Sequence, residues 1–300
     1  MEKVCVIIIN WNGKKHLEKC LPAISEQSYP NYEIMVVDNG STDGTIDYIN
    51  NYWPKVRIIA LKENKFFASG NNIGIQQALK NKEISYIALL NNDTIADKNW
   101  LSEMVKITDT DPRIGIVAAK LMKMGNQRII DSTGHIFDKW GKIVDRGHNE
   151  IDSGQYDTKV DVLGACAAAC LYRRTMLEDI GLFDERLVMY YEDAELSWRA
   201  YKRDWKAKYV PTAVVLHERG ASRRKNDKAL SVTSSFRRLK NQITVVKKYA
   251  NKQQKIVYAL RLCWKLIRAL RNTLTNTPGR ISLSDYLALL RYFFKNGLNS

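Results

Sequence analysis

Short apolar runs alternate with amphipathic stretches along the first 120 residues of the chain. Runs of β-branched and other apolar residues predict strands at 4–9, 32–37, 56–61, 84–90 and 114–119. Helical spacing of apolar residues predicts helices at 14–27, around 46–49 with Ser41 or Thr42 as its cap, and at 71–79. Repeated strand–helix units with wholly apolar strands indicate an α/β fold, in which a mostly parallel sheet is covered by helices on both faces.

The pattern changes after residue 125. Glycines and short polar runs at 125–160 predict hairpins and loops at the mouth of the sheet. Later segments predict a helix, an extended segment and then long helices, at 191–202, 207–216 and beyond 228. We therefore expect an α/β domain at 1–220 and a separate helical region at 221–300.

The basic character of the chain is confined to its C-terminal region. The formal net charge is +15, yet residues 219–300 hold 19 Lys and Arg against only Asp227 and Asp285, a net +17. The first 218 residues therefore carry −2. This asymmetry predicts two parts with different roles.

Cysteine usage and the N-terminus both indicate a cytoplasmic protein. The five cysteines are odd in number and include no CxxC pair, so buried reduced thiols account for them. Residues 1–3 lead straight into the first apolar run, without the longer apolar region of a signal peptide. No window approaches about 18 uncharged apolar residues, so we expect no transmembrane helix.

Four polar clusters each follow one of the predicted strands, at 10–13, 38–44, 64–74 and 91–93. Each cluster alone fits a turn followed by a helix cap. In an open α/β sheet, however, ligands bind at the carboxyl ends of the strands. Four such clusters together therefore predict a binding site along one edge of the sheet.

The side chains of these clusters suit a nucleotide. Trp11 can stack on a base, and Asp38 can accept hydrogen bonds from base or ribose. Gly40 and Gly70 would let the backbone approach a ligand closely. The clusters contribute further candidates for nucleotide contacts, which are Asn10, Asn12, Asn39, Asn64, Asn71 and Asn92.

Asp93 is the main candidate metal ligand. It offers a hard anionic oxygen after the strand at 84–90, and Asn91 offers a neutral one, a donor set that suits Mg²⁺ or Mn²⁺ carrying a diphosphate. The chain has neither GxGxxG nor GxxxxGK(S/T), so a bound diphosphate needs its charge neutralised from elsewhere, and a cation meets that need. The alternative is a strand that simply ends in an Asx-type turn.

Two further polar positions lie at the ends of predicted elements. Glu192 and Asp193 open the helix at 191–202, where they either stabilise the helix dipole or supply a general base that deprotonates an attacking hydroxyl. Glu192 is also a candidate substrate contact. His217 follows the apolar run 213–216 and is either structural or a further metal ligand, which would favour Mn²⁺ over Mg²⁺.

Taken in order, these residues resemble family 2 of the inverting glycosyltransferases, particularly its bacterial rhamnosyltransferase-like branch. The resemblance covers roughly 3–220 and rests on the stretches 6–13, 36–45, 70–74, 89–94, 164–166, 183–185, 192–199 and His217. It implies a GT-A fold, whose Rossmann-like sheet binds a nucleotide-diphosphate sugar and a divalent metal.

The resemblance also implies roles for individual residues. Asp93 stands at the end of the family's DXD motif as the metal-binding carboxylate, and Asp38 falls in the nucleotide-binding segment. Asp193 matches the catalytic base of an in-line displacement. His217 matches a metal ligand that part of the family has.

Three residues depart from the commoner family pattern. Asn91 replaces the first acid of DXD, which implies modest metal affinity, and Asn39 replaces a frequent aspartate, which implies an altered base preference. Glu195 stands where the branch often has Asp. Because the Asn variants also occur in the rhamnosyltransferase-like branch, the resemblance favours dTDP-rhamnose as the donor and leaves UDP-sugars open.

The C-terminal region predicts a basic amphipathic helix at 253–275. Five apolar residues share one face, and they are Ile256, Leu260, Trp264, Ile267 and Leu270. Five cations lie elsewhere on the helix, and they are Lys255, Arg261, Lys265, Arg268 and Arg271. Such a helix is typical of binding to an anionic membrane surface, and 286–294 has similar character. The alternatives are a helical subdomain packed on the core and a nucleic-acid-binding tail.

Together these features predict a metal-dependent, inverting hexosyltransferase. Its acceptor is expected to be a hydroxyl of a glycan or lipid-linked molecule in cell-surface polysaccharide synthesis, reached from the cytoplasmic face by a peripheral membrane protein. No nucleic-acid partner is expected. A nucleotidyltransferase is the alternative enzyme, but it should carry a basic glycine-rich phosphate loop early in the chain, and 10–13 does not resemble one.

Overall fold

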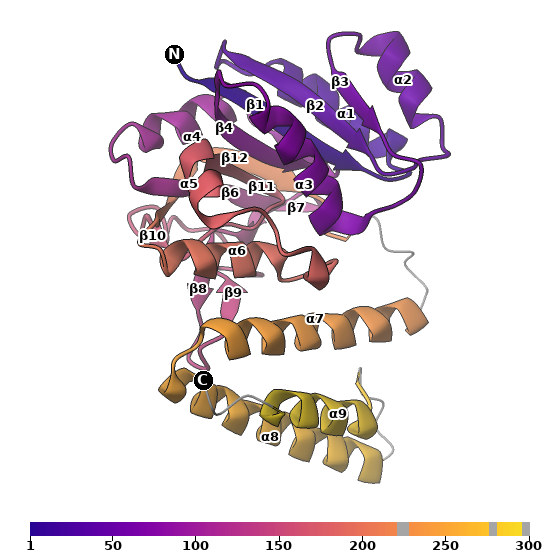
Figure 1. Ribbon diagram of the computed structural model, residues 1–300, viewed down its shortest axis with the longest axis vertical. Coiled ribbons are helices and arrows are strands. Elements are labelled where there is room, and N and C mark those ends of the chain that lie inside the picture. The colour runs from indigo at the N-terminus through magenta and orange to yellow at the C-terminus, as the bar shows by residue number, and fades with distance from the viewer. Residues whose placement is uncertain (221–227, 276–280, 296–300) are drawn as a thin grey trace. The chain divides into compact units, whose positions relative to one another are not determined.

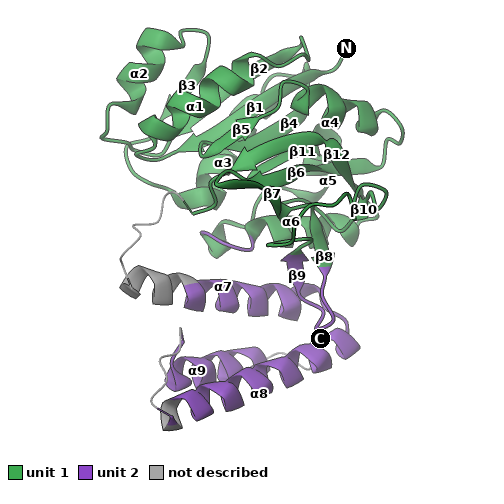
Figure 2. Ribbon diagram, turned by 180° about the vertical axis from the view of Figure 1, so that it is seen from behind, with its two compact units in different colours: residues 1–136, 145–188, 192–223 green, residues 137–144, 189–191, 224–300 purple. Residues whose placement is uncertain are grey.

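The computed structural model of the protein describes residues 1–220, 228–275 and 281–295. Contacts divide the chain into two compact units (Figure 2). Unit 1 comprises 1–136, 145–188 and 192–223, and unit 2 comprises 137–144, 189–191 and 224–300. The basic helical region expected at 221–300 includes residues 221–227, 276–280 and 296–300, which lie outside the described residues.

Unit 1 is built on one mixed sheet, which has ten strands among the described residues. Its main path is β10 (Asp161–Val162), β12 (Lys206–His217), β6 (Ile114–Lys123), β11 (Ala169–Arg173), β4 (Ile84–Asn91), β1 (Lys3–Asn10), β2 (Tyr32–Asp38) and β3 (Arg57–Ala60). Off this path, β5 (Thr94–Ala96) pairs with β12 and β7 (Asn126–Ser132) pairs with β6. The pairs β3–β2, β2–β1, β1–β4 and β6–β12 are parallel, whereas β11 is antiparallel to both of its neighbours.

Helices cover both faces of this sheet (Figure 1). Alternate residues of β1 point to opposite sides: Val4, Val6 and Ile8 join one apolar core, and Cys5 and Ile7 join the other. The first core takes in α1 (Lys14–Ser25), α2 (Thr45–Tyr52) and α4 (Trp100–Thr108), and the second takes in α3 (Phe66–Leu79), α5 (Arg174–Ile180) and α6 (Glu192–Tyr201). The predicted α/β fold is thereby confirmed.

Two local predictions were wrong. Helix α3 begins at Phe66 rather than at 71, so Gly70 lies inside a helix and not in a loop before it. Close packing of this helix on β1 outweighs the weak helix propensity of its Gly and Asn residues. The cap position of helix α2 is Gly44, whose φ is +78° and which has no side chain to cap the helix, and the Ser41 hydroxyl accepts from the Asn12 backbone N–H at 2.8 Å.

The segment at 125–160 forms the expected hairpins and loops. After β7, the short strands β8 (His135–Phe137) and β9 (Ile143–Asp145) pair with each other. The tip of this hairpin, residues 137–144, belongs to unit 2. A 3₁₀ turn, η1 (Glu185–Leu187), lies shortly before α6.

Unit 2 contains α7 (Lys228–Tyr249), α8 (Lys252–Leu274) and α9 (Leu283–Phe294). Tyr258 of α8 is buried, donates to Gln242 Oε1 at 2.7 Å, and packs its ring 5.9 Å from that of Phe293. The predicted apolar face of α8 is exposed, with Leu260 62% and Ile267 65% accessible. In the described ranges, no helix combines the length and apolar content needed to cross a membrane.

Gly74 tests the close packing of α3 on the sheet. A Cβ at this position would lie 2.8 Å from Ile7 Cγ2 and 2.9 Å from Val37 Cγ2, both on stiff, buried side chains. Overpacking costs about 1–3 kcal/mol, which exceeds the gain of about 1 kcal/mol in helix propensity. We expect Gly74→Ala to lower the free energy of unfolding by about 1 kcal/mol in urea titrations.

Gly125→Ala is the matched control, because nothing lies within 4 Å of its added Cβ. Equal stability of the two variants would show that α3 is not tightly seated on β1.

Candidate active site

The strand register brings the predicted site residues to one edge of unit 1. Asn10 at the end of β1 pairs with Asp38 at the end of β2, and Ile9 pairs with Asn91 at the end of β4. The carboxyl ends of these three parallel strands are therefore level. At this edge the polar clusters meet, as expected for a ligand site in an open α/β sheet.

Asn10 connects these strand ends. Its Nδ2 lies 3.2 Å from Asp38 Oδ1 and 3.2 Å from Thr45 Oγ1, and its Oδ1 accepts from Asn92 Nδ2 at 2.6 Å. A Cβ on Gly13 would lie 2.1 Å from Asn92 Nδ2, so glycine is what allows this contact. Asn10 and Asn92 thus hold the loops together, and a direct contact with nucleotide stays a prediction for both.

The other Asn side chains that were predicted to contact the nucleotide form hydrogen bonds with the protein backbone. Asn39 donates from Nδ2 to Phe66 O at 3.1 Å and accepts at Oδ1 from Lys65 N at 2.9 Å. Asn12 accepts from Thr42 N in the loop after β2, Asn64 accepts from Phe66 N, and Asn71 donates to Phe67 O within α3. These contacts shape the loops around the site, because buried or turn amides need hydrogen-bond partners.

Gly70 was expected to let the backbone approach a ligand closely, but the group that it approaches is a side chain of the protein. Its added Cβ would lie 2.3 Å from Ile9 Cδ1, because Gly70 faces β1 from within α3. Trp11, in contrast, is about half exposed at 48%, which leaves ring surface available for stacking. Asp38 is wholly buried, and its Oδ2 accepts from Ser41 N at 2.9 Å.

Asp93 and His217 are brought together by β5 and β12. Thr94 pairs with His217 across these strands, and Asp93 Oδ1 lies 3.4 Å from His217 Nε2. Both side chains are buried, and in the described structure Asp93 Oδ1 has no hydrogen-bond partner. Asn91 is the last residue of β4 and partly buried, and its role as a ligand stays a prediction.

Asp131 is a site residue that the sequence did not reveal. It is wholly buried at the end of β7, with Oδ2 2.8 Å from His217 Nδ1 and Oδ1 2.7 Å from Arg219 Nε and 3.3 Å from His148 Nδ1. Burial alone would raise the pKa of Asp131, but hydrogen bonds from both histidines and the charge of Arg219 lower it well below its usual value. The available signal was a carboxylate directly after the apolar pair 129–130.

His217 is held between two carboxylates. Burial alone would lower its pKa, but the hydrogen bond to Asp131 and the negative charges of Asp93 and Asp131 raise the pKa of His217 to about 9. Its Nδ1 faces Asp131 and its Nε2 faces Asp93. A carboxylate that holds one ring nitrogen while the other points at a ligand position is the usual outer partner of a metal-binding histidine.

These residues fit a divalent cation in part. The buried Asp93 Oδ1 without a partner is an oxygen suited to Mg²⁺ or Mn²⁺, and His217 Nε2 lies beside it. The described residues contain no group of three or more His, Cys, Asp and Glu arranged for a metal. Asp93 and His217 would therefore need the diphosphate, water and the predicted donor Asn91 to complete the coordination, as is common for Mg²⁺.

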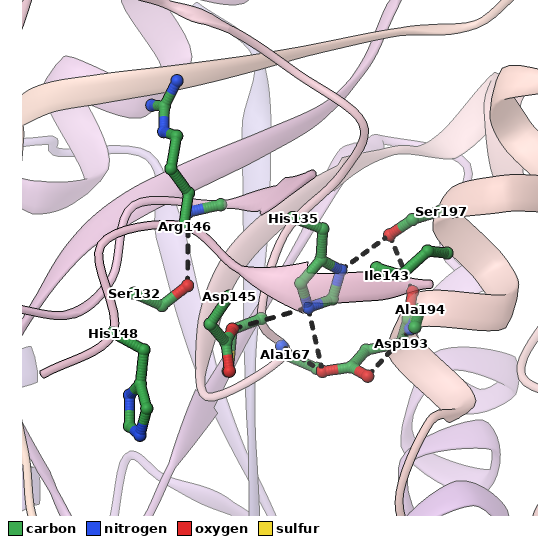
Figure 3. Close-up of polar contacts among 12 residues, drawn as sticks. Ser132, His135, Ile143, Asp145, Arg146, His148, Ala167, Asp193, Ala194 and Ser197 are labelled. Carbon is green, nitrogen blue, oxygen red and sulfur yellow. Dashed lines mark hydrogen bonds and ion pairs between the residues drawn. The ribbon is translucent and has the colours of Figure 1, made fainter. Parts of the chain in front are cut away.

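Asp193 lies in the first turn of α6 (Figure 3). Its Oδ2 accepts from Ala167 N at 3.2 Å and its Oδ1 from Ala194 N at 2.8 Å. The Asp193 side chain is 19% exposed, whereas the neighbouring Glu192 is 6% exposed. A general base has to reach its substrate, so this difference favours Asp193 over Glu192 for that role.

His135 is a second site residue that sequence reasoning left unassigned. Its Nε2 lies 3.8 Å from Asp193 Oδ2 and 3.6 Å from Asp145 Oδ1 (Figure 3). Ser197 Oγ donates to Asp193 O at 2.7 Å and lies 3.3 Å from His135 Nδ1. Gly164 permits this arrangement, because its added Cβ would lie 1.9 Å from Ser197 Oγ.

A continuous series of contacts joins the two halves of the site. Arg219 contacts Asp131 on one side and Asp145 on the other, with Nη2 2.9 Å from Asp145 Oδ2. Asp131 in turn contacts His217, and Asp145 contacts His135. The candidate metal ligands and the candidate base are therefore held by one electrostatic network.

Asp131→Asn tests this network. The change leaves Arg219 and His217 with a neutral partner in a buried setting, and breaking such a buried pair costs about 3–5 kcal/mol, with less expected here because Arg219 is 37% exposed. We expect the free energy of unfolding in urea to fall by about 2 kcal/mol or more.

Asp161→Asn is the matched control, because it makes the same change in an exposed ion pair with Lys208. It should alter stability by about 1 kcal/mol or less. If the two variants are equally stable, Asp131 does not organise the site.

The chain is similar to several known proteins. A family model described as "Glycosyl transferase family 2" matches residues 5–181, so the match ends before Asp193 and His217. An N-acetylglucosaminyl-diphospho-decaprenol L-rhamnosyltransferase of Mycobacterium tuberculosis is 26% identical over 245 residues, 72% of this chain and 76% of that protein. A poly-beta-1,6-N-acetyl-D-glucosamine synthase of Staphylococcus epidermidis is 24% identical over 220 residues, 71% of this chain. The chain spans 49% of that synthase.

Solved structures share the fold. GalNAc-T7, solved with UDP, GalNAc and Mn²⁺, has a TM-score of 0.68 at 17% identity, over 100% of this chain and 58% of that one. The mannosyltransferase PcManGT of Pyrobaculum calidifontis, solved with GDP-Man and Mn²⁺, has a TM-score of 0.60 at 16% identity, over 98% and 87%. At these identities the likeness establishes a GT-A-like fold and nothing further.

Proposed function

The chain belongs to glycosyl transferase family 2, and we propose that it moves a sugar from a nucleotide-diphosphate donor to a hydroxyl of a glycan or lipid-linked acceptor, with inversion at the anomeric carbon. The observation that carries this proposal is the network linking Asp93 and His217 to Asp193 at one edge of the sheet. It provides a place for the leaving diphosphate and a base for the acceptor. In this proposal residues 1–220 are the catalytic domain.

Asp193 begins the reaction as general base. It takes the proton from the acceptor hydroxyl, whose oxygen then forms a bond to the anomeric carbon while the bond from that carbon to the diphosphate oxygen breaks. A single displacement of this kind inverts the configuration. His135 acts through Asp193 as a positioning residue, because it lies 3.8 Å from the Asp193 carboxylate and is itself fixed by Asp145 and Ser197.

Asp93 and His217 would hold Mn²⁺ or Mg²⁺, with Asn91 as an additional oxygen donor and Asp131 orienting the imidazole. A divalent cation bound there would stabilise the negative charge that develops on the diphosphate. These three protein donors would leave the remaining coordination positions to the substrate itself.

Nucleotide contacts are assigned to the loops after β1, β2 and β3. Trp11 supplies a stacking surface for the base. Asp38, at the end of β2, pairs with Asn10, the residue that precedes Trp11. The mycobacterial relative is named as a rhamnosyltransferase acting on a lipid diphosphate, and this supports dTDP-rhamnose as the first donor to test. The structural neighbours hold UDP and GDP-Man, so UDP- and GDP-sugars belong in the same test.

The C-terminal region is assigned to the membrane surface. The α8 face with Ile256, Leu260 and Trp264 is exposed, and residues 219–300 carry +17. Apolar side chains beside cations suit the interface of an anionic bilayer. We therefore place the enzyme as a peripheral protein on the cytoplasmic face, where it meets lipid-linked acceptors.

Donor turnover tests the function. The protein is incubated with dTDP-rhamnose, UDP-GlcNAc, UDP-glucose and GDP-mannose, each with Mn²⁺, Mg²⁺ or EDTA, and released nucleotide is measured. We expect metal-dependent hydrolysis of one donor, and transfer to added acceptor to fall about 10²–10⁴-fold in Asp193→Asn while nucleotide affinity is retained. Full transfer by Asp193→Asn would remove it as the base, and turnover of no donor would contradict the proposed function.

His135→Asn tests the positioning role. Because His135 does not form part of the proposed donor site, we expect kcat to fall about tenfold or more while the donor KM stays within about twofold. His16→Asn is the control, since the carboxylate beside that partly exposed histidine is Glu218, at 3.9 Å, and not Asp193. A rise in donor KM with unchanged kcat would contradict the role.

A further inference from the structure

Unit 2 contains a cavity of about 460 Å³ that the proposed reaction does not use. One wall is the tip of the β8–β9 hairpin, with Asp138, Lys139, Trp140 and Lys142. The other wall is α8, with Arg261, Trp264 and Lys265. All seven residues belong to the same compact unit (Figure 2).

The lining carries an excess of positive charge. Four cationic side chains meet one carboxylate, Asp138, whose Oδ1 already accepts from the backbone N–H groups of Trp140 at 2.9 Å and Lys142 at 3.1 Å. Burial, together with the charges of Arg261 and Lys142, lowers the pKa of Lys265 to about 8. Positive charges crowded in a partly buried space are stabilised when an anion enters.

Arg261 provides independent support for an anion. Its Nη1 is buried and has no hydrogen-bond partner in the described part of the chain. A buried donor without a partner is costly, so the arrangement favours a ligand with acceptor oxygens. The guanidinium fork matches the geometry of phosphate, which it binds through two parallel N–H···O bonds.

An apolar surface begins at the same cavity. Trp264 is 54% exposed, and Ile256, Leu260 and Ile267 share its face of α8 at 48%, 62% and 65% exposure. Free inorganic phosphate would leave these side chains in water. A molecule with a phosphate group and a hydrocarbon chain would satisfy both the cations and the apolar face.

We propose that this cavity binds the phosphate or diphosphate group of a lipid whose hydrocarbon chain lies along the exposed apolar face of α8. The same chemistry has two sources, an anionic phospholipid and a polyprenyl-diphosphate acceptor. Only the second source rests on the proposed function.

The test measures binding of the full-length protein to phosphatidylcholine vesicles by flotation. The vesicles contain no addition, sparse polyprenyl diphosphate, or phosphatidylglycerol. The variant Arg261→Gln/Lys265→Gln removes two cavity cations, and Lys252→Gln/Arg271→Gln removes two exposed cations of α8 that do not line the cavity. Arg261→Lys/Lys265→Arg keeps the cavity charge, and thermal unfolding checks that every variant is folded.

We expect the cavity variant to bind doped vesicles about tenfold or more weakly than wild type, while the exposed-cation variant changes less and the charge-preserving variant retains binding. Loss confined to polyprenyl diphosphate identifies the acceptor as the source, and loss confined to phosphatidylglycerol identifies phospholipid. The proposal is overturned if both charge-removing variants lose vesicle binding equally, or if the cavity variant loses none. Donor hydrolysis by wild type is measured separately, so failure of the proposed function is distinguishable.

Discussion

A carboxylate removed from water has to be compensated by cations or hydrogen-bond donors, and Asp131 shows how this requirement organises the candidate active site. Its wholly buried carboxylate forms ion pairs with His217, His148 and Arg219. Arg219 extends the network to Asp145, which lies beside the histidine that contacts Asp193. A single desolvation requirement therefore links the candidate metal ligands Asp93 and His217 to the candidate base Asp193.

The parts of the fold that local patterns determine were predictable. Continuous apolar runs define β1, β2 and β4, and a polar residue after each run marks the sheet edge where Asp38 and Asp93 lie. The same rule identified His217. Asp131 and His135 escaped it because β7 and β8 lie where glycines interrupt the pattern, and their partners come from strands and helices distant in sequence.

The sequence was sufficient to identify the polar strand ends, but not to predict which groups each polar side chain would bind. Asn10 and Asn39 were expected to face a nucleotide, and both bond to neighbouring loops in this structure. A buried amide leaves its partners open until long-range packing is known. Exposure provides the distinction that sequence lacked at 192–193, because Asp193 is accessible and Glu192 is not.

Charge alone does not distinguish a membrane from a nucleic acid as the partner of the C-terminal region, since both attract Lys and Arg. The apolar side chains do distinguish them. Leu260, Trp264 and Ile267 are more than half exposed on one face of α8, and burying each such side chain contributes about 1.5–3 kcal/mol. A phosphate backbone offers these residues no apolar environment, whereas a lipid offers both a phosphate and hydrocarbon. The combination of partly buried cations, such as Arg261 and Lys265, and exposed apolar residues therefore favours a lipid partner.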